Sequence, residues 1–253
     1  MQPRFVGRLG LADAVTVTNA ALGFVAAAVA ATAPGLAARL LLLAAIADGL
    51  DGVIARVRGS TPVGEFLDSL ADVASFGVAP ALLVYSVVRA EWGLSLSHPT
   101  LRTAVALAVP ALFVAVAVVR LGLYTAYDLG TTHTQGVQTT LAATMLAVGY
   151  LAGVRSAPVV LGATAVFCYL MVAPLSYPEL HARDALVIGA VQALTVLFPT
   201  AYGRLFPRVL FVVAAAYFVG APWFYWRRQG VAGDADPGPP DPGTETNDGG
   251  PTE

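Results

Sequence analysis

Charged residues are scarce in this chain of 253 residues, and lysine is absent altogether. Asp, Glu, Lys and Arg make up 12% of the sequence, whereas a soluble globular protein carries about 25%. The single cysteine, Cys168, excludes a disulfide within the chain. A formal net charge of −2 argues against a nucleic-acid-binding protein. With 57% hydrophobic residues and a mean hydropathy of +0.72, the composition predicts an integral membrane protein.

The apolar residues fall into about eight segments, which we interpret as transmembrane helices. They cover residues 11–33, 35–57, 66–88, 101–124, 137–155, 157–176, 185–199 and 208–226. A spanning helix needs about 20 apolar residues, so only the seventh segment is short. The alternating pattern of a membrane β-barrel is missing from the sequence. The predicted fold class is therefore all-α, a polytopic membrane helix bundle with about eight transmembrane helices.

The end of the chain has a different composition from the rest. Residues 229–253 hold six Gly, five Pro and six acidic residues, and such a segment cannot bury enough apolar surface to fold. We expect a membrane domain at residues 1–228 and a disordered acidic tail at 229–253. Eight spans place both termini on the same side of the membrane. Arg227 and Arg228, directly after the last span, favour the cytoplasmic side of the cell membrane.

Four carboxylates interrupt the apolar segments. Asp48 and Asp51 are three residues apart in the second span, and Asp68 and Asp72 are four apart at the start of the third. Each pair therefore shares one face of its helix. A charged residue at membrane depth costs at least about 2.5 kcal/mol and normally faces a partner or a cavity. The short loop between the two spans makes them antiparallel neighbours, so all four carboxylates can meet at one membrane face.

Four carboxylates that converge without counter-charge would repel one another. Two divalent cations would neutralise them, and oxygen ligands alone favour Mg²⁺, Mn²⁺ or Ca²⁺ over Zn²⁺. Ion pairs with nearby arginines are the structural alternative. Small residues beside the acidic faces, Gly52, Ala55 and Gly64, would let a phosphate-bearing group approach the backbone, although helix packing in membranes uses the same residue types.

Together these positions form one pattern, Asp48-x2-Asp51-Gly52-x2-Ala55-Arg56-x7-Gly64-x3-Asp68-x3-Asp72. At these residues the sequence resembles the CDP-alcohol phosphatidyltransferases, whose signature has two acids, Gly, Ala-Arg, then Gly and two further acids. The gap between Arg56 and Gly64 is seven residues, one fewer than is common in that family. The missing residue falls in the predicted loop, so both helical spacings are kept.

The resemblance implies a reaction and a role for each matching residue. Asp48, Asp51, Asp68 and Asp72 would hold two divalent ions, Mg²⁺ or Mn²⁺, on the pyrophosphate of a CDP-linked lipid. Asp68 and Asp72 would be catalytic, with Asp72 as the base that accepts the proton of the acceptor hydroxyl. The CDP-lipid would be bound by Gly52, Ala55, Arg56 and Gly64. Asn19, a polar residue in the first span, would either bridge helices or reach the nucleotide of the CDP-lipid. A phosphatidyl-type group would be transferred to an alcohol, with release of CMP. The resemblance also implies a catalytic core of six helices, to which this chain would add two further helices.

Other segments resemble the phosphatidylserine synthase branch of that family. They include residues 67–85 and a segment that begins at Asn19. Around residues 119–140 the match is partial, because Arg120 and Gly136 are kept while a second Arg and an Asn of that branch are missing. The resemblance favours L-serine as the acceptor, bound by Arg120 and Gly136, and Gln135 in the adjacent loop is a further candidate for contact with the acceptor. The donor is left open between CDP-diacylglycerol and CDP-archaeol, and glycerol 3-phosphate or inositol phosphate is the alternative acceptor.

A cation-coupled transporter would also use buried acids, but spans five to eight contain no second acidic pair. The expected partners are therefore the CDP-linked lipid, L-serine and the membrane lipid, with no nucleic acid. Members of the family commonly form homodimers through membrane helices, and the Ala- and Gly-rich spans permit the same here.

Overall fold

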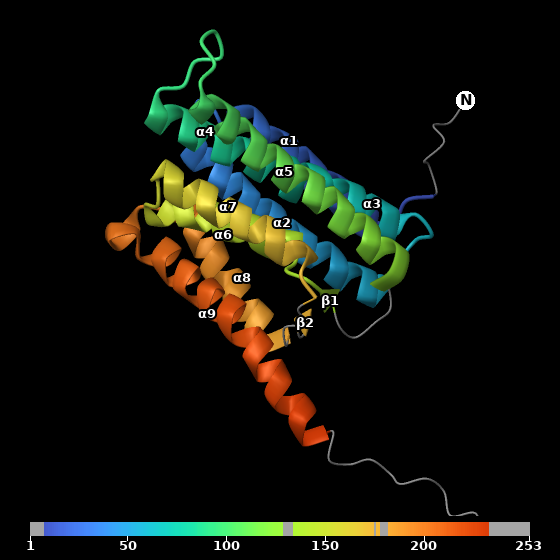
Figure 1. The fold of residues 1–253 in the computed structure, drawn as a ribbon. Coiled ribbons are helices and arrows are strands. Elements are labelled where there is room, and N and C mark those ends of the chain that lie inside the picture. Colours follow the sequence, from blue (N-terminus) through green and yellow to red (C-terminus); the bar gives the residue numbers. More distant parts are fainter. Residues whose placement is uncertain (1–7, 129–133, 175, 178–181, 233–253) are drawn as a thin grey trace, which may run out of the picture.

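The computed structural model describes residues 8–128, 134–174, 176–177 and 182–232. Nearly all of these residues are helical, which confirms the predicted all-α fold class (Figure 1). The elements in chain order are α1 (Leu11–Val29), α2 (Pro34–Arg58), α3 (Gly64–Asp72), the π-helical turn η1 (Val73–Val78), α4 (Ala79–Trp92), α5 (Leu101–Leu123), the π-helical turn η2 (Tyr124–Asp128), β1 (Thr134–Gln135), α6 (Thr139–Ala152), α7 (Ala157–Val172), β2 (Ser176–Tyr177), α8 (Ala182–Leu197) and α9 (Ala201–Ala232).

Among the described residues, four helical stretches are long and apolar enough to cross a membrane. They are Leu11–Val29, Gly64–Trp92, Leu101–Tyr127 and Ala201–Gly220. Three apolar helices are shorter, at Thr139–Ala152, Ala157–Val172 and Val187–Leu197. The helix α2 has 25 residues, but it carries the carboxylates Asp48 and Asp51 as well as arginines. The bundle is consistent with a polytopic membrane protein, and the number of eight spans stays a prediction.

The helices α1 and α2 form an extensive antiparallel pair, to which the other helices are added. α1 also packs against α3 and η1, whereas α2 packs against α6 and α8. α8 and α9 lie on the side of the bundle away from α3 and α5 (Figure 1). The C-terminal ends of α2 and α5 and the start of α3 lie at one end of the bundle, opposite the turn between α4 and α5 (Figure 1).

The third span is a continuous helix with a wide turn in its middle. In η1, the Ala79 amide donates to the Ala74 carbonyl, one residue further back than in an α-helix. Pro80 follows directly, and its missing N–H explains why the regular hydrogen-bond pattern cannot continue there. The Ser75 hydroxyl in this turn donates to the Asn19 carbonyl at 2.8 Å. The two backbones approach so closely that a Cβ at Gly23 would lie 2.5 Å from the Ser75 hydroxyl oxygen, so α1 is fixed directly against η1.

Two short elements were not predicted from the sequence. β1 and β2 form an antiparallel ladder that pairs Thr134 with Tyr177 and Gln135 with Ser176. The ladder ties the segment before α6 to the segment after α7, at the end of the bundle that also holds the carboxylates. The helix α9 continues through residues 229–232, beyond the predicted end of the membrane domain. The rest of the predicted acidic tail, residues 233–253, lies outside the described residues.

Candidate active site

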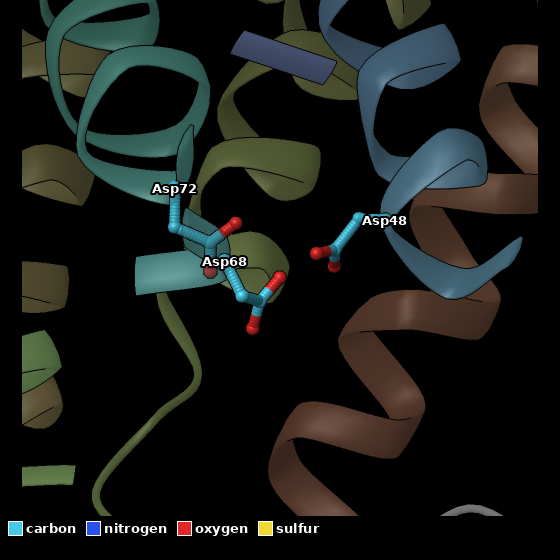
Figure 2. A group of neighbouring side chains, drawn as sticks. All are labelled: Asp48, Asp68 and Asp72. Carbon is cyan, nitrogen blue, oxygen red and sulfur yellow. The ribbon is translucent and has the colours of Figure 1, made fainter. Parts of the chain in front are cut away.

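Three of the four predicted carboxylates converge in the structure. Asp48 projects from α2, and Asp68 and Asp72 project from α3 toward it (Figure 2). Each contributes a carboxylate oxygen to a group in which all such oxygens lie within 4.8 Å of one another. Asp72 is buried, while Asp48 and Asp68 are partly buried. The arrangement follows from the sequence, because the spacing of four residues places Asp68 and Asp72 on the same face of α3.

The group has the chemistry of a site for a hard divalent cation. Its potential ligand atoms are all carboxylate oxygens, which suit Mg²⁺, Mn²⁺ or Ca²⁺. Within the described residues, the buried Oδ1 atom of Asp72 has no hydrogen-bond partner. A buried carboxylate oxygen without a partner is unfavourable unless a cation or another donor satisfies it. The cluster could therefore hold a metal ion.

Asp51, the fourth predicted ligand, does not belong to this group. It is buried at 6% exposure, and its Oδ2 atom accepts a hydrogen bond from the Thr16 hydroxyl of α1 at 2.6 Å. The expectation that all four carboxylates converge on one another is thus met by three of them. The reason is the position of α1, which packs against both α2 and α3 and offers a hydroxyl to the face of α2 that carries Asp51.

A first cavity of about 300 Å³ opens between α1, α2 and α3. Its lining includes three of the carboxylates, Asp48, Asp51 and Asp68, and the small residues Gly52, Ala55 and Gly64. The remaining lining residues are Ala12, Asp13, Thr16, Ser60 and Glu65, so acidic side chains line this cavity and none of its described lining residues is basic. The structure thus brings three of the four acidic positions and all three small positions of the sequence pattern around one cavity.

A second cavity of about 180 Å³ lies on the other side of the carboxylates. Its lining combines Asp48, Asp68 and Asp72 with Ser69, Arg120, Leu121, Tyr124, Gln138 and Thr140. Asp48 and Asp68 therefore face both cavities, whereas Asp51 lines only the first and Asp72 only the second. The carboxylate group therefore lies between the two cavities and contributes to the lining of both.

Arg120 is the basic residue among those that line the second cavity. It is 8% exposed, and its Nη1 atom donates to the Thr139 hydroxyl at 3.2 Å. Its guanidinium carbon lies 5.9 Å from the ring centroid of Tyr124, which is a cation–π distance. Arg120 and Tyr124 also line a third cavity of about 340 Å³, together with Leu123, Tyr127 and residues 171–174. Arg120 thus lies where the second and third cavities adjoin.

Arg56 and Asn19, which were also predicted to bind the CDP-lipid, are not among the described residues that line these cavities. Arg56 is exposed on α2 and is not among the residues that line the first cavity. Asn19 is fully buried beside η1, and its side-chain atoms have no hydrogen-bond partner within the described residues. Gln135 lies in β1, and the placement of its side chain is outside the described part of the structure.

Gly136 has a structural reason for being glycine. Its φ is +75°, and a Cβ at this position would lie 2.2 Å from the Met171 carbonyl oxygen. The next residue, Val137, donates its amide to the Leu170 carbonyl at 3.0 Å. Gly136 therefore lets the chain turn tightly against the end of α7, whose last residues line the third cavity. This packing accounts for the residue without contact to a substrate.

Several polar residues of the site were missed in the sequence. Asp13 lines the first cavity and Thr16 bonds to Asp51. The Ser69 hydroxyl, at the second cavity, lies 2.5 Å from the Thr125 hydroxyl of η2. Thr140 contacts Asp48 at 3.4 Å. Asp13 carried a usable signal, because it is an acid within the first apolar segment, whereas the hydroxyl residues give no signal by themselves.

The comparison with known protein families decides what this site belongs to. The family model described as CDP-alcohol phosphatidyltransferase matches residues 9–198, which includes both cavities and all four carboxylates. The chain belongs to the CDP-alcohol phosphatidyltransferase family. This membership confirms the resemblance found in the sequence. Together with the apolar helices, it indicates a multi-pass integral membrane protein.

Similar proteins of this family come from bacteria and archaea. The chain is 50% identical over 56 residues to a CDP-diacylglycerol–serine O-phosphatidyltransferase of Mycobacterium leprae, a match that covers 22% of this chain and 19% of the relative. It is 40% identical over 82 residues to an archaetidylserine synthase of Methanothermobacter thermautotrophicus, covering 31% and 35% of the two chains. A Helicobacter pylori protein with the same name as the first is 39% identical over 90 residues, covering 35% and 34%. The matched part is thus about a third or less of each relative.

Proposed function

We propose that this protein transfers a phosphatidyl-type group from a CDP-linked lipid to the hydroxyl of L-serine and releases CMP. The observation that carries the proposal is the position of Asp48 and Asp68, which line the first and second cavities at once. A transferase must hold a donor and an acceptor on opposite sides of the reacting phosphorus, and the carboxylate group lies between two such spaces. The names of similar proteins, which include serine phosphatidyltransferases and an archaetidylserine synthase, support serine as the acceptor.

The first cavity is the proposed donor site. A bound Mg²⁺ or Mn²⁺ pair would neutralise the pyrophosphate and the charge that develops on the leaving CMP. The ligands would be Asp48, Asp68 and Asp72, with Asp51 on the donor side. Because the described residues that line this cavity include no basic side chain, the phosphates would depend on cations for neutralisation. Gly52, whose missing Cβ would have no neighbour within 4 Å, leaves open space on the wall of α2 for the nucleotide.

The second cavity is the proposed acceptor site. Arg120 can pair with the carboxylate of serine there, and charge-assisted hydrogen bonds of this kind are strong and directional. Phosphorylated acceptors call for several cations, but among the described residues that line this cavity Arg120 alone is basic. Tyr124 and Thr125 stand where the resemblance to the serine branch is incomplete, and Tyr124 completes the cavity wall. These features favour a small zwitterionic acceptor.

The transfer itself is a substitution at phosphorus. The serine hydroxyl oxygen forms a bond to the phosphorus that carries the lipid, and the bond from this phosphorus to the CMP oxygen breaks. The hydroxyl proton passes to Asp72, which lines the acceptor side and has a buried oxygen without a hydrogen-bond partner in the described structure. Asp48 and Asp68 lie between the donor and the acceptor, and Arg120 orients the acceptor.

We further propose that the site opens to the cytoplasm and that the protein forms a homodimer in the membrane. Arg227 and Arg228, which lie in the sequence of the C-terminal part of α9, support the orientation, because cytoplasmic ends carry an excess of positive charge. Cysteine labelling in a Cys168→Ser background would test it. A thiol reagent that does not cross the membrane should label Ser97→Cys, in the turn between α4 and α5, from outside intact cells. It should label Arg58→Cys only after the cells are opened, and the reverse pattern would overturn the orientation.

Crosslinking in native membranes should capture a dimer, and the capture of monomers alone would contradict the proposed homodimer.

The proposed function is tested by supplying competing acceptors. Membranes that contain the full chain would receive CDP-diacylglycerol or CDP-archaeol, Mg²⁺ or Mn²⁺, and radiolabelled serine, glycerol 3-phosphate or inositol phosphate. We expect label in the lipid fraction only from serine, with one of the two donors clearly preferred. If glycerol 3-phosphate or inositol phosphate is incorporated in place of serine, the proposed transfer reaction stands but the proposed acceptor, serine, is wrong.

A further inference from the structure

Asp13 is a buried carboxylate to which the proposed reaction assigns no role. It lies in the first turn of α1 and is only 2% exposed, yet it lines the first cavity. A carboxylate in such a place is costly unless its oxygen atoms are bound by donors. The hydrogen bonds that Asp13 accepts therefore indicate its role in the structure.

One oxygen of Asp13 joins two separate parts of the chain. Its Oδ2 atom accepts a hydrogen bond from the Gly10 amide at 2.7 Å and another from the Thr61 hydroxyl at 2.8 Å. Gly10 precedes α1, and Thr61 belongs to the loop between α2 and α3. Asp13 thus ties this loop to the start of α1, although the two are 48 residues apart.

The other oxygen of Asp13 faces the beginning of α3. A Cβ at Gly64 would lie 3.2 Å from Oδ1, so the carboxylate packs closely against the first residue of α3. Thr16, three residues further along the same face of α1, holds Asp51 of α2. Two residues on one face of α1 therefore bond to α2 and to the loop before α3, on either side of the first cavity. The lining of the second cavity includes neither Asp13 nor Thr61.

We propose that Asp13 is a positioning residue for the donor: through Thr61 it fixes the loop before α3 and so maintains the width of the first cavity for the cytidine nucleotide. The inference rests on the proposed function for the nature of this ligand. It predicts that loss of the bond weakens binding in the first cavity and leaves the second cavity unaffected.

The test uses the full chain, purified in detergent micelles, and four variants. Asp13→Ala removes both hydrogen bonds, and Thr61→Val removes only the bond to the loop. Asp13→Asn retains an oxygen that can accept from Gly10 and Thr61. Thr18→Val is the matched control, because Thr18 is exposed on α1 and its hydroxyl bonds only to the Ala14 carbonyl of the same helix. Hydrogen exchange of residues 59–64 and calorimetric binding of CDP with Mg²⁺ are measured for each protein.

We expect faster exchange of residues 59–64 and about 10-fold weaker CDP binding in Asp13→Ala and Thr61→Val, as for the loss of a typical hydrogen bond. Asp13→Asn should remain closer to the wild type, and Thr18→Val should equal it. For turnover, the KM for the CDP-lipid should rise while the KM for serine stays unchanged.

Three results would overturn the inference. If Asp13→Ala fails to fold, Thr61→Val alone decides, and CDP binding equal to that of the wild type would contradict the inference. Equal increases in the KM values of both substrates would indicate a general structural role instead. A wild type that does not bind CDP would overturn the inference and the proposed function together. Normal CDP binding without serine turnover would contradict only the proposed acceptor.

Discussion

The Thr16 hydroxyl of α1 donates to the Asp51 carboxylate of α2 at 2.6 Å, and both residues are buried. This bond turns Asp51 toward α1 and leaves Asp48, Asp68 and Asp72 as the group whose oxygens lie within 4.8 Å of one another. Asp51 nevertheless lines the first cavity beside Asp48 and Asp68. The bond from Thr16 therefore holds Asp51 on the side of the carboxylate group that faces the first cavity.

The first prediction concerns this bond. Thr16→Val keeps the shape of the side chain but removes the donor, which leaves a buried carboxylate oxygen unsatisfied. The free energy of unfolding should fall by about 1–3 kcal/mol, and the KM for the CDP-lipid should rise more than the KM for serine. Thr18→Val, which removes an exposed hydroxyl of the same helix, should change neither quantity. An unchanged donor KM in Thr16→Val would show that the orientation of Asp51 does not matter for the donor.

The spacing of residues within each helix allowed much of the site to be predicted. Asp68 and Asp72 share a face because they are four residues apart, and the short loop brings Asp48 opposite them. The turn toward Thr16 could not be predicted, because it depends on the packing of α1 against α2 and no local spacing encodes it. The same holds for Ser69 and Thr125, which meet across two helices. Hydroxyl side chains are common in membrane helices, so their sequence positions alone do not mark a site.

The second prediction tests the open wall of the first cavity. A Cβ at Gly52 would have no neighbouring atom within 4 Å, so Gly52→Ala adds a methyl group to the cavity without a clash. Alanine is favoured over glycine in a helix by about 1 kcal/mol, so the variant should be at least as stable as the wild type. We expect a higher KM for the CDP-lipid because the added methyl group takes space from the nucleotide.

Gly49→Ala is the matched control for this substitution. Gly49 lies on the same helix, is exposed, and a Cβ there would also have no neighbour within 4 Å. It does not line the first cavity. Both variants should gain similar stability, and only Gly52→Ala should lose donor affinity. Equal kinetics for the two variants would place the nucleotide elsewhere.

The third prediction concerns the acceptor. Arg120→Gln removes the charge proposed to bind the serine carboxylate, and Arg120→Lys keeps the charge but loses the planar pair of donors. The KM for serine should rise about 10- to 100-fold in Arg120→Gln, which is the range for a lost hydrogen bond to a charged group. The KM for serine should rise less in Arg120→Lys than in Arg120→Gln, and the KM for the CDP-lipid should stay near its original value in both variants.

Arg102→Gln provides the control for a lost arginine. Arg102 is exposed near the start of α5, with its guanidinium 5.6 Å from the Trp92 ring centroid, at the end of the bundle opposite the site. Its replacement should leave both KM values unchanged. If Arg120→Gln leaves the KM for serine unchanged, the carboxylate of the acceptor must be bound by other residues.

The central claim is that the carboxylate group of Asp48, Asp68 and Asp72 supports metal-dependent transfer to serine. The most direct measurement follows CMP release and incorporation of labelled serine into lipid together, for the wild type and Asp72→Asn. The wild type should form the two products in equal amounts with Mg²⁺ or Mn²⁺, and should stop when a chelator removes the metal. Asp72→Asn should insert into the membrane and lose activity by about 10²–10⁴-fold, the contribution of a general base. Full activity in Asp72→Asn, or in the presence of the chelator, would contradict the account.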